Sequence, residues 1–111
     1  VYRFARQFPQ VKLICAHWGG GLPFYELMPM VSAALTNVYY DTAASIFLYR
    51  ATVFPMVVSA IGAKKVLFGT DFPLLGQKRF LTHVRESGLA AGDLARVLGG
   101  NAVELLKLEA R

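Results

Sequence analysis

Residues 11–21 have the sequence VKLICAHWGGG, in which a short apolar run is followed by a histidine, a tryptophan and three glycines. Such a run is typical of a buried strand in a parallel sheet. His17 therefore stands where a strand ends and a turn begins, and the glycines allow positive φ angles beside its imidazole. In parallel α/β folds, ligands bind beyond the carboxyl ends of the strands. The stretch predicts a functional histidine at that edge of the sheet.

Two more segments have the same character, 38–42 and 66–69, and the three strands begin 27 and 28 residues apart. Helical patterns fill the intervals, so the order strand, helix, strand, helix, strand, helix predicts a parallel sheet in one α/β domain over 1–111. We expect Pro29 to kink the first intervening helix and Pro55 to break the second, and short helices to follow the last strand. The second of these, near the end of the chain, is predicted to be capped by Asn101.

Asp71 lies in the sequence LFGTDFP (67–73), directly after the third strand, so its carboxylate is expected at the same edge as His17. An imidazole and a carboxylate suit a divalent metal such as Zn²⁺, whose bound water becomes a nucleophile near neutral pH. Asp71 would bind the metal and accept the proton of the water, while His17 steadies the water or polarises the substrate. The alternatives are a hydrogen-bonded structural histidine and an aspartate in a turn or cap.

Neighbours of these two residues are candidates for substrate binding. Trp18, Gly19 and Phe72 are predicted to contact substrate, although aromatic residues at strand ends also pack under loops. The glycines could instead hold a phosphate, but the spacing of a dinucleotide-binding turn is not met. Asp41 is expected in a turn or cap rather than against substrate, and His83 on a solvated helix surface.

Composition limits the remaining possibilities. Hydrophobic residues make up 55% of the chain and charged residues 17%, which is typical of a globular domain. The net charge of +5 comes from scattered Lys and Arg residues, so we expect no nucleic-acid partner. No apolar run is long enough to span a membrane and no signal peptide is visible, which predicts a cytoplasmic protein. Cys15 is alone and is expected to be a buried apolar residue rather than part of a disulfide.

The order of four motifs resembles a known family. The motifs are Ala16 to Gly21, Asn37 to Ala43, Leu67 to Pro73 and Gly100 to Ala102. Together they resemble the amidohydrolase-related metal-dependent enzymes, the group that contains aminocarboxymuconate semialdehyde decarboxylase. The resemblance implies strands six to eight of a TIM (β/α)8 barrel, followed by short C-terminal helices.

For the site, the resemblance implies that His17 is an active-site residue and that Asp71 is a metal ligand. The metal would be zinc, with manganese as the alternative. The family's H-x-H pair and its further histidine ligand have no counterpart in this sequence. Because an apolar helical pattern already begins at Val1, we expect a C-terminal piece of a larger enzyme, inactive by itself.

The predicted function is that of a metal-dependent hydrolase acting on a small organic acid, ester, amide or lactone-like substrate. A non-oxidative decarboxylase of the same family is the first alternative. A non-catalytic α/β module that binds a small molecule or phosphate is the second. The expected partners are the small-molecule substrate and either further copies of the protein or the missing part of the barrel.

Overall fold

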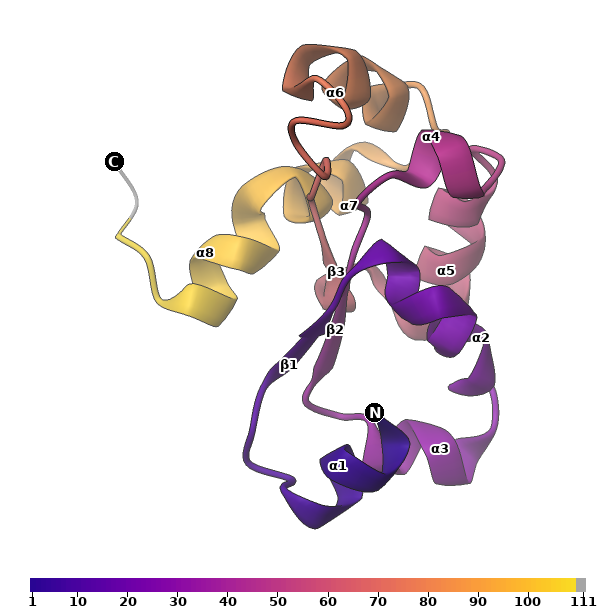
Figure 1. Cartoon of the computed structure of the whole chain (residues 1–111), viewed down its shortest axis with the longest axis vertical. Helices are drawn as coiled ribbons and strands as arrows, with labels where there is room; N and C mark the ends of the chain where they lie inside the picture. The colour runs from indigo at the N-terminus through magenta and orange to yellow at the C-terminus, as the bar shows by residue number, and fades with distance from the viewer. Residues whose placement is uncertain (110–111) are drawn as a thin grey trace.

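The computed structural model describes residues 1–109, and a three-stranded parallel sheet lies at its centre (Figure 1). The strands lie side by side in chain order, with Leu13 opposite Val38 and Tyr40 opposite Val66. The strands are short and run from β1 (Leu13–Cys15) through β2 (Val38–Asp41) to β3 (Val66–Leu67). This confirms the predicted α/β class and the parallel sheet.

Helices precede, connect and follow the strands. Their bounds are α1 (Tyr2–Gln7), η1 (His17–Gly21), α2 (Leu22–Tyr25), α3 (Pro29–Ala34), α4 (Ser45–Leu48), α5 (Val53–Ile61), η2 (Ala63–Lys65), α6 (Gln77–Arg85), α7 (Ala91–Ala95), η3 (Arg96–Gly100) and α8 (Asn101–Leu106).

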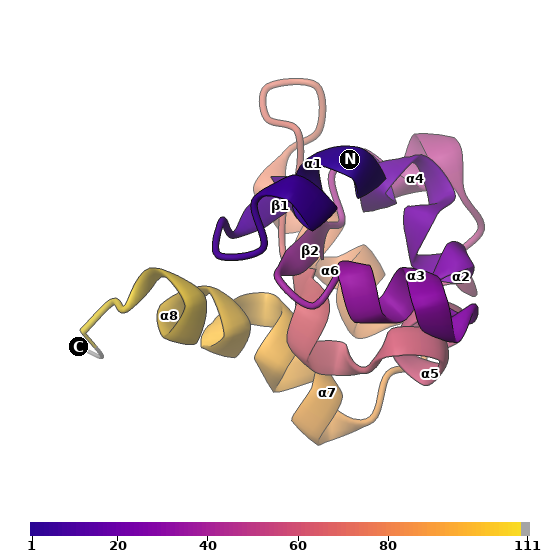
Figure 2. The same ribbon diagram turned by 90° about the horizontal axis from the view of Figure 1, so that it is seen from below.

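The two faces of the sheet are covered unequally. Along β2, Val38 and Tyr40 are buried while Tyr39 and Asp41 are only half-buried, which is the alternation expected of a strand. In Figure 2, α2, α3 and α5 lie on one side of the strands. Ile14, in the middle of β1, keeps 49% of its surface exposed. One face of the sheet therefore forms the core, and part of the other remains open.

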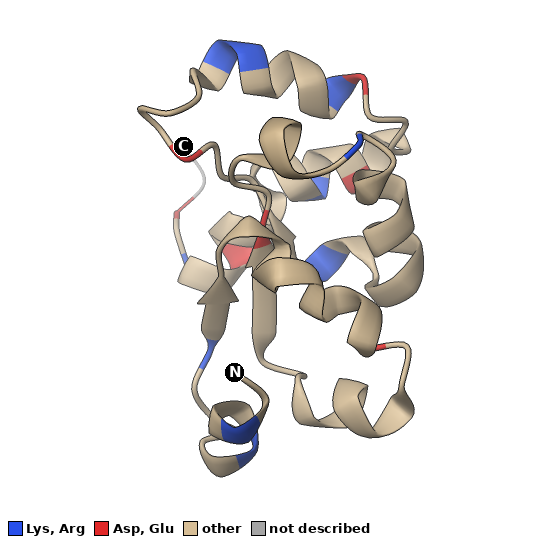
Figure 3. Ribbon diagram, turned by 45° about the vertical axis from the view of Figure 1, so that its right-hand side comes forward, with Lys and Arg blue, Asp and Glu red and all other residues tan. Residues whose placement is uncertain are grey.

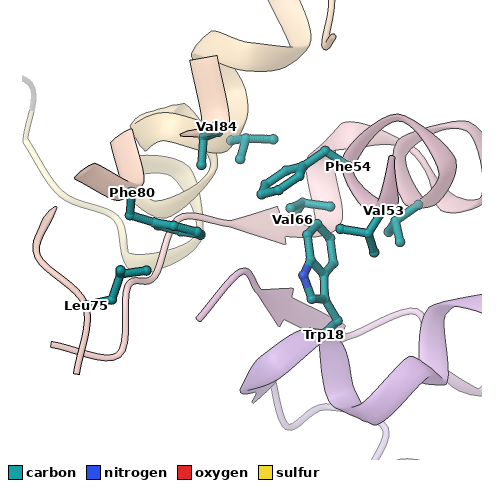
Figure 4. Packing of buried hydrophobic residues seen from close by; sticks show 9 residues of the cluster. Trp18, Val53, Phe54, Val66, Leu75, Phe80 and Val84 are labelled. Carbon is teal, nitrogen blue, oxygen red and sulfur yellow. The ribbon is translucent and has the colours of Figure 1, made fainter. Parts of the chain in front are cut away.

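Aromatic side chains dominate the core between the sheet and the helices (Figure 4). Trp18 and Phe54 meet edge to face, with ring centroids 5.1 Å apart, and Phe54 in turn approaches Phe80. Val66 of β3 and Val84 of α6 pack in the same cluster. Because aromatic side chains bury the largest areas, this cluster fixes α5 and α6 against the sheet.

Two helix predictions need correction at proline. Pro29 does not kink a continuous helix but begins α3, after a break over residues 26–28. Pro55 does not break a helix but lies inside the first turn of α5. In both positions the residue needs no backbone N–H, since the first turn of a helix has no acceptor for it within the helix.

Charge and hydropathy add two observations. Lys and Arg are spread over several elements, as Figure 3 shows. This distribution is the one on which the expectation of no nucleic-acid partner was based, and that expectation stays a prediction. Among the helices of residues 1–109, none combines the length and the apolar composition that crossing a membrane requires.

Candidate active site at the carboxyl ends of the strands

His17 is the second residue after β1 and has a left-handed backbone with φ 56°. Trp18 shares this conformation, and so do Gly19 and Gly20, so the chain turns sharply at the strand end. A left-handed conformation costs energy for a residue with a Cβ, and the surrounding contacts must hold it. The turn leaves the imidazole half-exposed above the sheet.

Asp71 also has a left-handed backbone, with φ 68°, and it follows β3 by four residues. The carbonyl of Asp71 accepts a hydrogen bond from Leu74 N at 2.9 Å, and Phe72 N donates to Thr70 Oγ1 at 3.1 Å. These bonds close a tight turn that presents the carboxylate at the same edge as His17. Both candidate catalytic residues therefore stand at conformationally strained positions.

The structure brings the two side chains together. His17 Nε2 and Asp71 Oδ2 are 3.1 Å apart, although 54 positions separate the residues in the sequence. Each side chain is partly open to solvent, with exposed fractions of 45% and 42%. The hydrogen bond between them requires a proton on Nε2 or on the carboxyl, so the pair can hold and pass a proton.

An open apolar cavity of about 520 Å³ adjoins the pair. Apart from the imidazole and the carboxylate, its walls carry no polar side chain. A volume of this order suits a small organic ligand. The lining residues are His17, Ala44, Phe47, Leu48, Asp71 and Leu74. Two convergent polar groups in an apolar hollow are the usual make-up of a small-molecule site.

Trp18 does not belong to this cavity, and the prediction that it forms a wall of a substrate pocket is wrong for its side chain. Only 1% of its surface is exposed. The indole packs against Phe54, and its Nε1–H donates to Ser45 Oγ at 2.7 Å. The left-handed turn at residues 17–20 directs the indole down into the core while the preceding imidazole points to the cavity.

Gly19 and Phe72 have different surroundings. A Cβ on Gly19 would come within 3.0 Å of the Tyr40 ring and 3.3 Å of Cys15 Cβ, so this position requires glycine for close packing. Phe72 is 70% exposed at the edge of the site. The substrate contacts expected of Gly19 and Phe72 stay predictions.

Asp41, at the end of β2, makes a contact that the sequence did not indicate. Its Oδ1 accepts hydrogen bonds from the backbone N–H of Ala43 and from the backbone N–H of His17, each at 3.0 Å. The first bond is the predicted turn. The second joins the ends of two neighbouring strands, and no local pattern could have shown it because 24 positions separate the two residues.

A buried polar network lies beneath the turn at His17. Tyr40 Oη donates to Glu26 Oε2 at 2.6 Å, and Lys65 Nζ donates to Glu26 Oε1 at 2.6 Å. Burial and the nearby Glu26 carboxylate raise the pKa of the Tyr40 phenol. Desolvation likewise raises the pKa of the Cys15 thiol, but the side chain is only partly buried, so the prediction of a buried apolar cysteine is corrected.

Two further predictions are corrected here. His83 is not a solvated surface residue, because its ring packs on Phe54 and Phe80 and its Nε2 is buried without a partner. Asn101 does not cap α8. Its amide instead donates to the carbonyls of Ala63 and Val66, at 2.6 and 2.8 Å. Hydrophobic periodicity carries no signal for either contact, since both depend on how distant elements meet.

A family model described as amidohydrolase matches residues 1–108. The chain belongs to the amidohydrolase family. No match is found among curated protein sequences.

Solved structures share the fold of this amidohydrolase chain. A dihydroxybenzoic acid decarboxylase from Polaromonas sp. JS666, with bound manganese and the inhibitor 2-nitroresorcinol, superposes with a TM-score of 0.78 at 22% identity, over 95% of this chain and 36% of that one. For 5-carboxyvanillate decarboxylase from Sphingomonas paucimobilis, the TM-score is 0.81 at 18% identity, over 97% of this chain and 37% of that one. A zinc-bound amidohydrolase from Burkholderia multivorans superposes with a TM-score of 0.67 at 20% identity, over 98% of this chain and 48% of that one.

The amidohydrolase chain thus spans little more than a third of the length of the two decarboxylases. The same architecture appears in a protein described as a TIM barrel from Bordetella bronchiseptica, with a TM-score of 0.75 at 21% identity, over 96% of this chain and 37% of that one. The three parallel strands and their helices are therefore part of a TIM barrel, as the resemblance of the motifs implied. In such barrels the carboxyl ends of the strands form the active-site face.

Donor chemistry at the edge of the sheet fits a divalent metal in part. The Asp71 carboxylate and the His17 imidazole are both metal-ligand types, and both face the cavity. Within residues 1–109, no group of three or more His, Cys, Asp or Glu side chains is placed to hold a metal ion. The described chain therefore offers two of the donors that a catalytic metal requires.

Proposed function

We propose that this chain supplies the proton-transfer half of the active site of a metal-dependent amidohydrolase-family enzyme that acts on a small organic acid. The observation that carries the proposal is the contact of His17 Nε2 with Asp71 Oδ2 at 3.1 Å, on the wall of the apolar cavity. Both residues stand at the carboxyl ends of parallel strands, the edge at which TIM-barrel enzymes carry out chemistry. The strained backbone at both positions is a further mark of a functional site.

Asp71 is the proposed metal ligand of this chain. Its carboxylate is half-exposed toward the cavity, and oxygen ligands are accepted by both zinc and manganese. A bound metal would supply Lewis-acid stabilisation of negative charge on the substrate. Zinc is the first candidate because it readily accepts histidine and carboxylate ligands, and manganese is the alternative. The solved relatives include one with each metal. The remaining ligands would come from the parts of the barrel that this chain does not span.

His17 is the proposed acid–base residue. The imidazole is the side chain whose charge changes most readily near neutral pH, and Asp71 orients it through the 3.1 Å contact. Its exposed position lets it reach a substrate atom in the cavity. The backbone turn around it is fixed by the packing of Trp18 and Gly19, which reduces the freedom of the ring.

Decarboxylation is the reaction that we favour. The cavity walls are apolar, which suits an aromatic or otherwise carbon-rich acid, and two of the solved relatives described above are decarboxylases of hydroxylated aromatic acids. A proton held by the His17–Asp71 pair would add to the carbon that bears the carboxylate. The electron pair of the breaking carbon–carbon bond then restores the double bond of the ring as carbon dioxide leaves. Phe72, exposed at the rim, would pack against the substrate.

Hydrolysis is the second candidate, and the match to the amidohydrolase family model supports it. In that case the same pair would accept a proton from the attacking water and return it to the leaving group. The two reactions differ in whether carbon dioxide is released, so one set of assays separates them.

The test uses the whole protein that carries this chain, loaded with zinc or with manganese. Carbon dioxide release from hydroxylated benzoic acids and acid release from esters and lactones are measured, with deuterium incorporation from heavy water as a check on decarboxylation. His17→Asn is expected to reduce kcat by about a hundredfold or more with metal content unchanged. Asp71→Asn should reduce both metal content and kcat.

The matched control is His83→Phe, which alters the second histidine but preserves its aromatic packing on Phe54 and Phe80. It should leave kcat within about twofold of the parent. Absence of turnover with both metals on both substrate classes, or full activity of His17→Asn, would contradict the proposed function.

A further inference from the structure

Asp41 occupies the central position at the active edge of the sheet. It is the last residue of β2, the strand that lies between β1 and β3. The two strands that flank β2 lead to the candidate catalytic residues, since His17 follows β1 and Asp71 follows β3. A side chain at this position can therefore influence both.

Toward β1, the contact is a hydrogen bond to the backbone of the catalytic candidate itself. His17 N–H donates to Asp41 Oδ1 at 3.0 Å, and the same oxygen accepts the N–H of Ala43. His17 has φ 56°, a conformation that a residue with a Cβ rarely adopts without external support. The Asp41 carboxylate provides that support at the backbone, while the imidazole remains free to reach Asp71.

Toward β3, the contact is close packing. A Cβ on Gly69 would lie 3.3 Å from Asp41 Cγ and 3.4 Å from its Cβ, so the chain passes directly against the carboxyl group. The next residue, Thr42, is fully buried. Its hydroxyl accepts a hydrogen bond from Gly69 N–H at 3.1 Å and donates one to the Gly69 carbonyl at 3.0 Å. Gly69 precedes Asp71 by two positions, so the location of Asp71 depends on this packing.

We infer that Asp41 is a positioning residue: one of its carboxylate oxygens sets the distance between His17 and Asp71 by holding the His17 backbone in its left-handed conformation. The role needs a hydrogen-bond acceptor at the position of Oδ1 and does not need the negative charge. It goes beyond the turn between Asp41 and Ala43, because that turn alone would not reach β1.

The acceptor and the charge are separated by two conservative variants made in the whole protein. Asp41→Asn keeps an oxygen at the same position without charge, whereas Asp41→Glu keeps the charge and moves the oxygen by one methylene. Asn is expected to preserve the site and Glu to disturb it. Asp41→Ala removes the acceptor entirely, and Asp93→Ala in the first turn of α7 is the matched control for loss of a carboxylate.

The readout that does not need turnover is the modification of His17 by diethyl pyrocarbonate, followed by peptide mass spectrometry across a pH series. His83, with its buried Nε2, is the internal reference. Asp41→Ala and Asp41→Glu should shift the pH profile of His17 modification, and Asp41→Asn and Asp93→Ala should not. Circular dichroism checks that each variant folds; if Asp41→Ala does not, the comparison of Asn with Glu decides.

The kinetic readout rests on the proposed function. With a substrate that the enzyme turns over, Asp41→Glu should lower kcat by about ten- to a hundredfold and change KM far less. Asp41→Asn should stay within about threefold of the parent. Equal damage by Asn and Glu, or an unchanged His17 profile in Asp41→Ala and Asp41→Glu, would overturn the inference. If no substrate is found, the proposed function fails, while the His17 profile still decides the role of Asp41.

Discussion

At the scale of single residues, backbone strain is concentrated at the site. Within residues 1–109, the residues other than glycine with positive φ are His17, Trp18, Ala44, Asp71 and Lys107. Only Lys107 lies away from the carboxyl ends of the strands. Each such conformation costs about 1–3 kcal/mol and persists only where the surrounding contacts hold it. These strained backbone conformations place the side chains of His17 and Asp71 in contact.

Replacing His17 by glycine should therefore relieve the backbone strain at this position while it abolishes activity. Glycine adopts φ 56° without a Cβ penalty, and the half-exposed contact with Asp71 contributes little to stability. We expect His17→Gly to be more stable than His17→Ala by about 1 kcal/mol, measured by urea unfolding. The Ala variant is the control, because it removes the same imidazole but keeps a Cβ. Equal stability of the two variants would show that the turn is not strained.

The sequence pattern was sufficient to locate His17 and Asp71 but not to show where the side chains of the adjacent residues point. A histidine and an aspartate that directly follow buried strands are visible in the pattern, and parallel strands bring their ends to one edge. The position of Trp18 was not visible, because a left-handed backbone at a residue other than glycine leaves no signal in hydrophobic periodicity. The same holds for the bond between Asp41 and His17, which joins different strands.

At the scale of elements, the network of Glu26, Tyr40 and Lys65 joins the end of α2, the middle of β2 and the end of η2. Lys65 Nζ also donates to the carbonyl of Leu35 at 2.7 Å, so the chain before β2 is included. Glu26 and Lys65 are an ion pair whose carboxylate is almost fully buried. Breaking such a pair leaves a buried charge without a partner, so the network fixes where the helices sit on the sheet.

Tyr40→Phe tests this network through the pH dependence of stability. Burial and Glu26 raise the pKa of the Tyr40 phenol above the value of about 10 in the unfolded chain. The folded state therefore keeps this proton after the unfolded state has lost it, and its contribution to stability falls as pH rises above about 10. Tyr40→Phe should destabilise the protein by about 1 kcal/mol at neutral pH and make the alkaline fall shallower.

The control for this experiment is Tyr39→Phe, the neighbouring position on the less buried side of β2. It should change stability less at neutral pH and leave the alkaline fall intact, as followed by thermal unfolding. An alkaline fall that is unaffected in Tyr40→Phe would contradict the role given to the phenol.

Element order was predictable and element boundaries were not. Short β-branched and aromatic runs identified all three strands, because their spacing leaves room for one crossover helix each. The strands observed are shorter than the runs, since pairing stops where the chain turns toward the site. The prolines were read as breaks, yet both fit the first turn of a helix, where a missing N–H is harmless.

At the scale of the whole molecule, the sheet has two edge strands and one partly open face. Parallel sheets are normally covered on both faces, and exposed edges pair readily with other chains. We expect the 111-residue chain alone to self-associate at micromolar concentration, and Ile14→Glu on the open face to reduce this association. Sedimentation velocity measures both.

Met30 is the matched position on the other side of the molecule, at 77% exposure in α3. Met30→Glu should leave the association unchanged. If it reduces association as much as Ile14→Glu, the outer helices and not the open sheet face carry the contact. The homo-oligomeric state expected of the whole enzyme stays a prediction.

The barrel itself could not be deduced from the periodicity of this chain. Three strand–helix units are compatible with an open sheet as well as with a closed barrel, because closure depends on strands that this chain does not contain. The resemblance of its motifs to a family was needed for that step. The placement of α8 was equally hidden, since it rests on the side chain of one residue.

That residue, Asn101, fixes the last helix by donating its amide hydrogens to the carbonyl of Ala63, at the start of η2, and to that of Val66, the first residue of β3. An aspartate has nothing to donate there, and its ionised oxygens would face two acceptors of like polarity. Deamidation of Asn101 to aspartate would therefore detach α8 from the strand that leads to Asp71. The longevity of the site is in this way linked to a group that lies far from the chemistry.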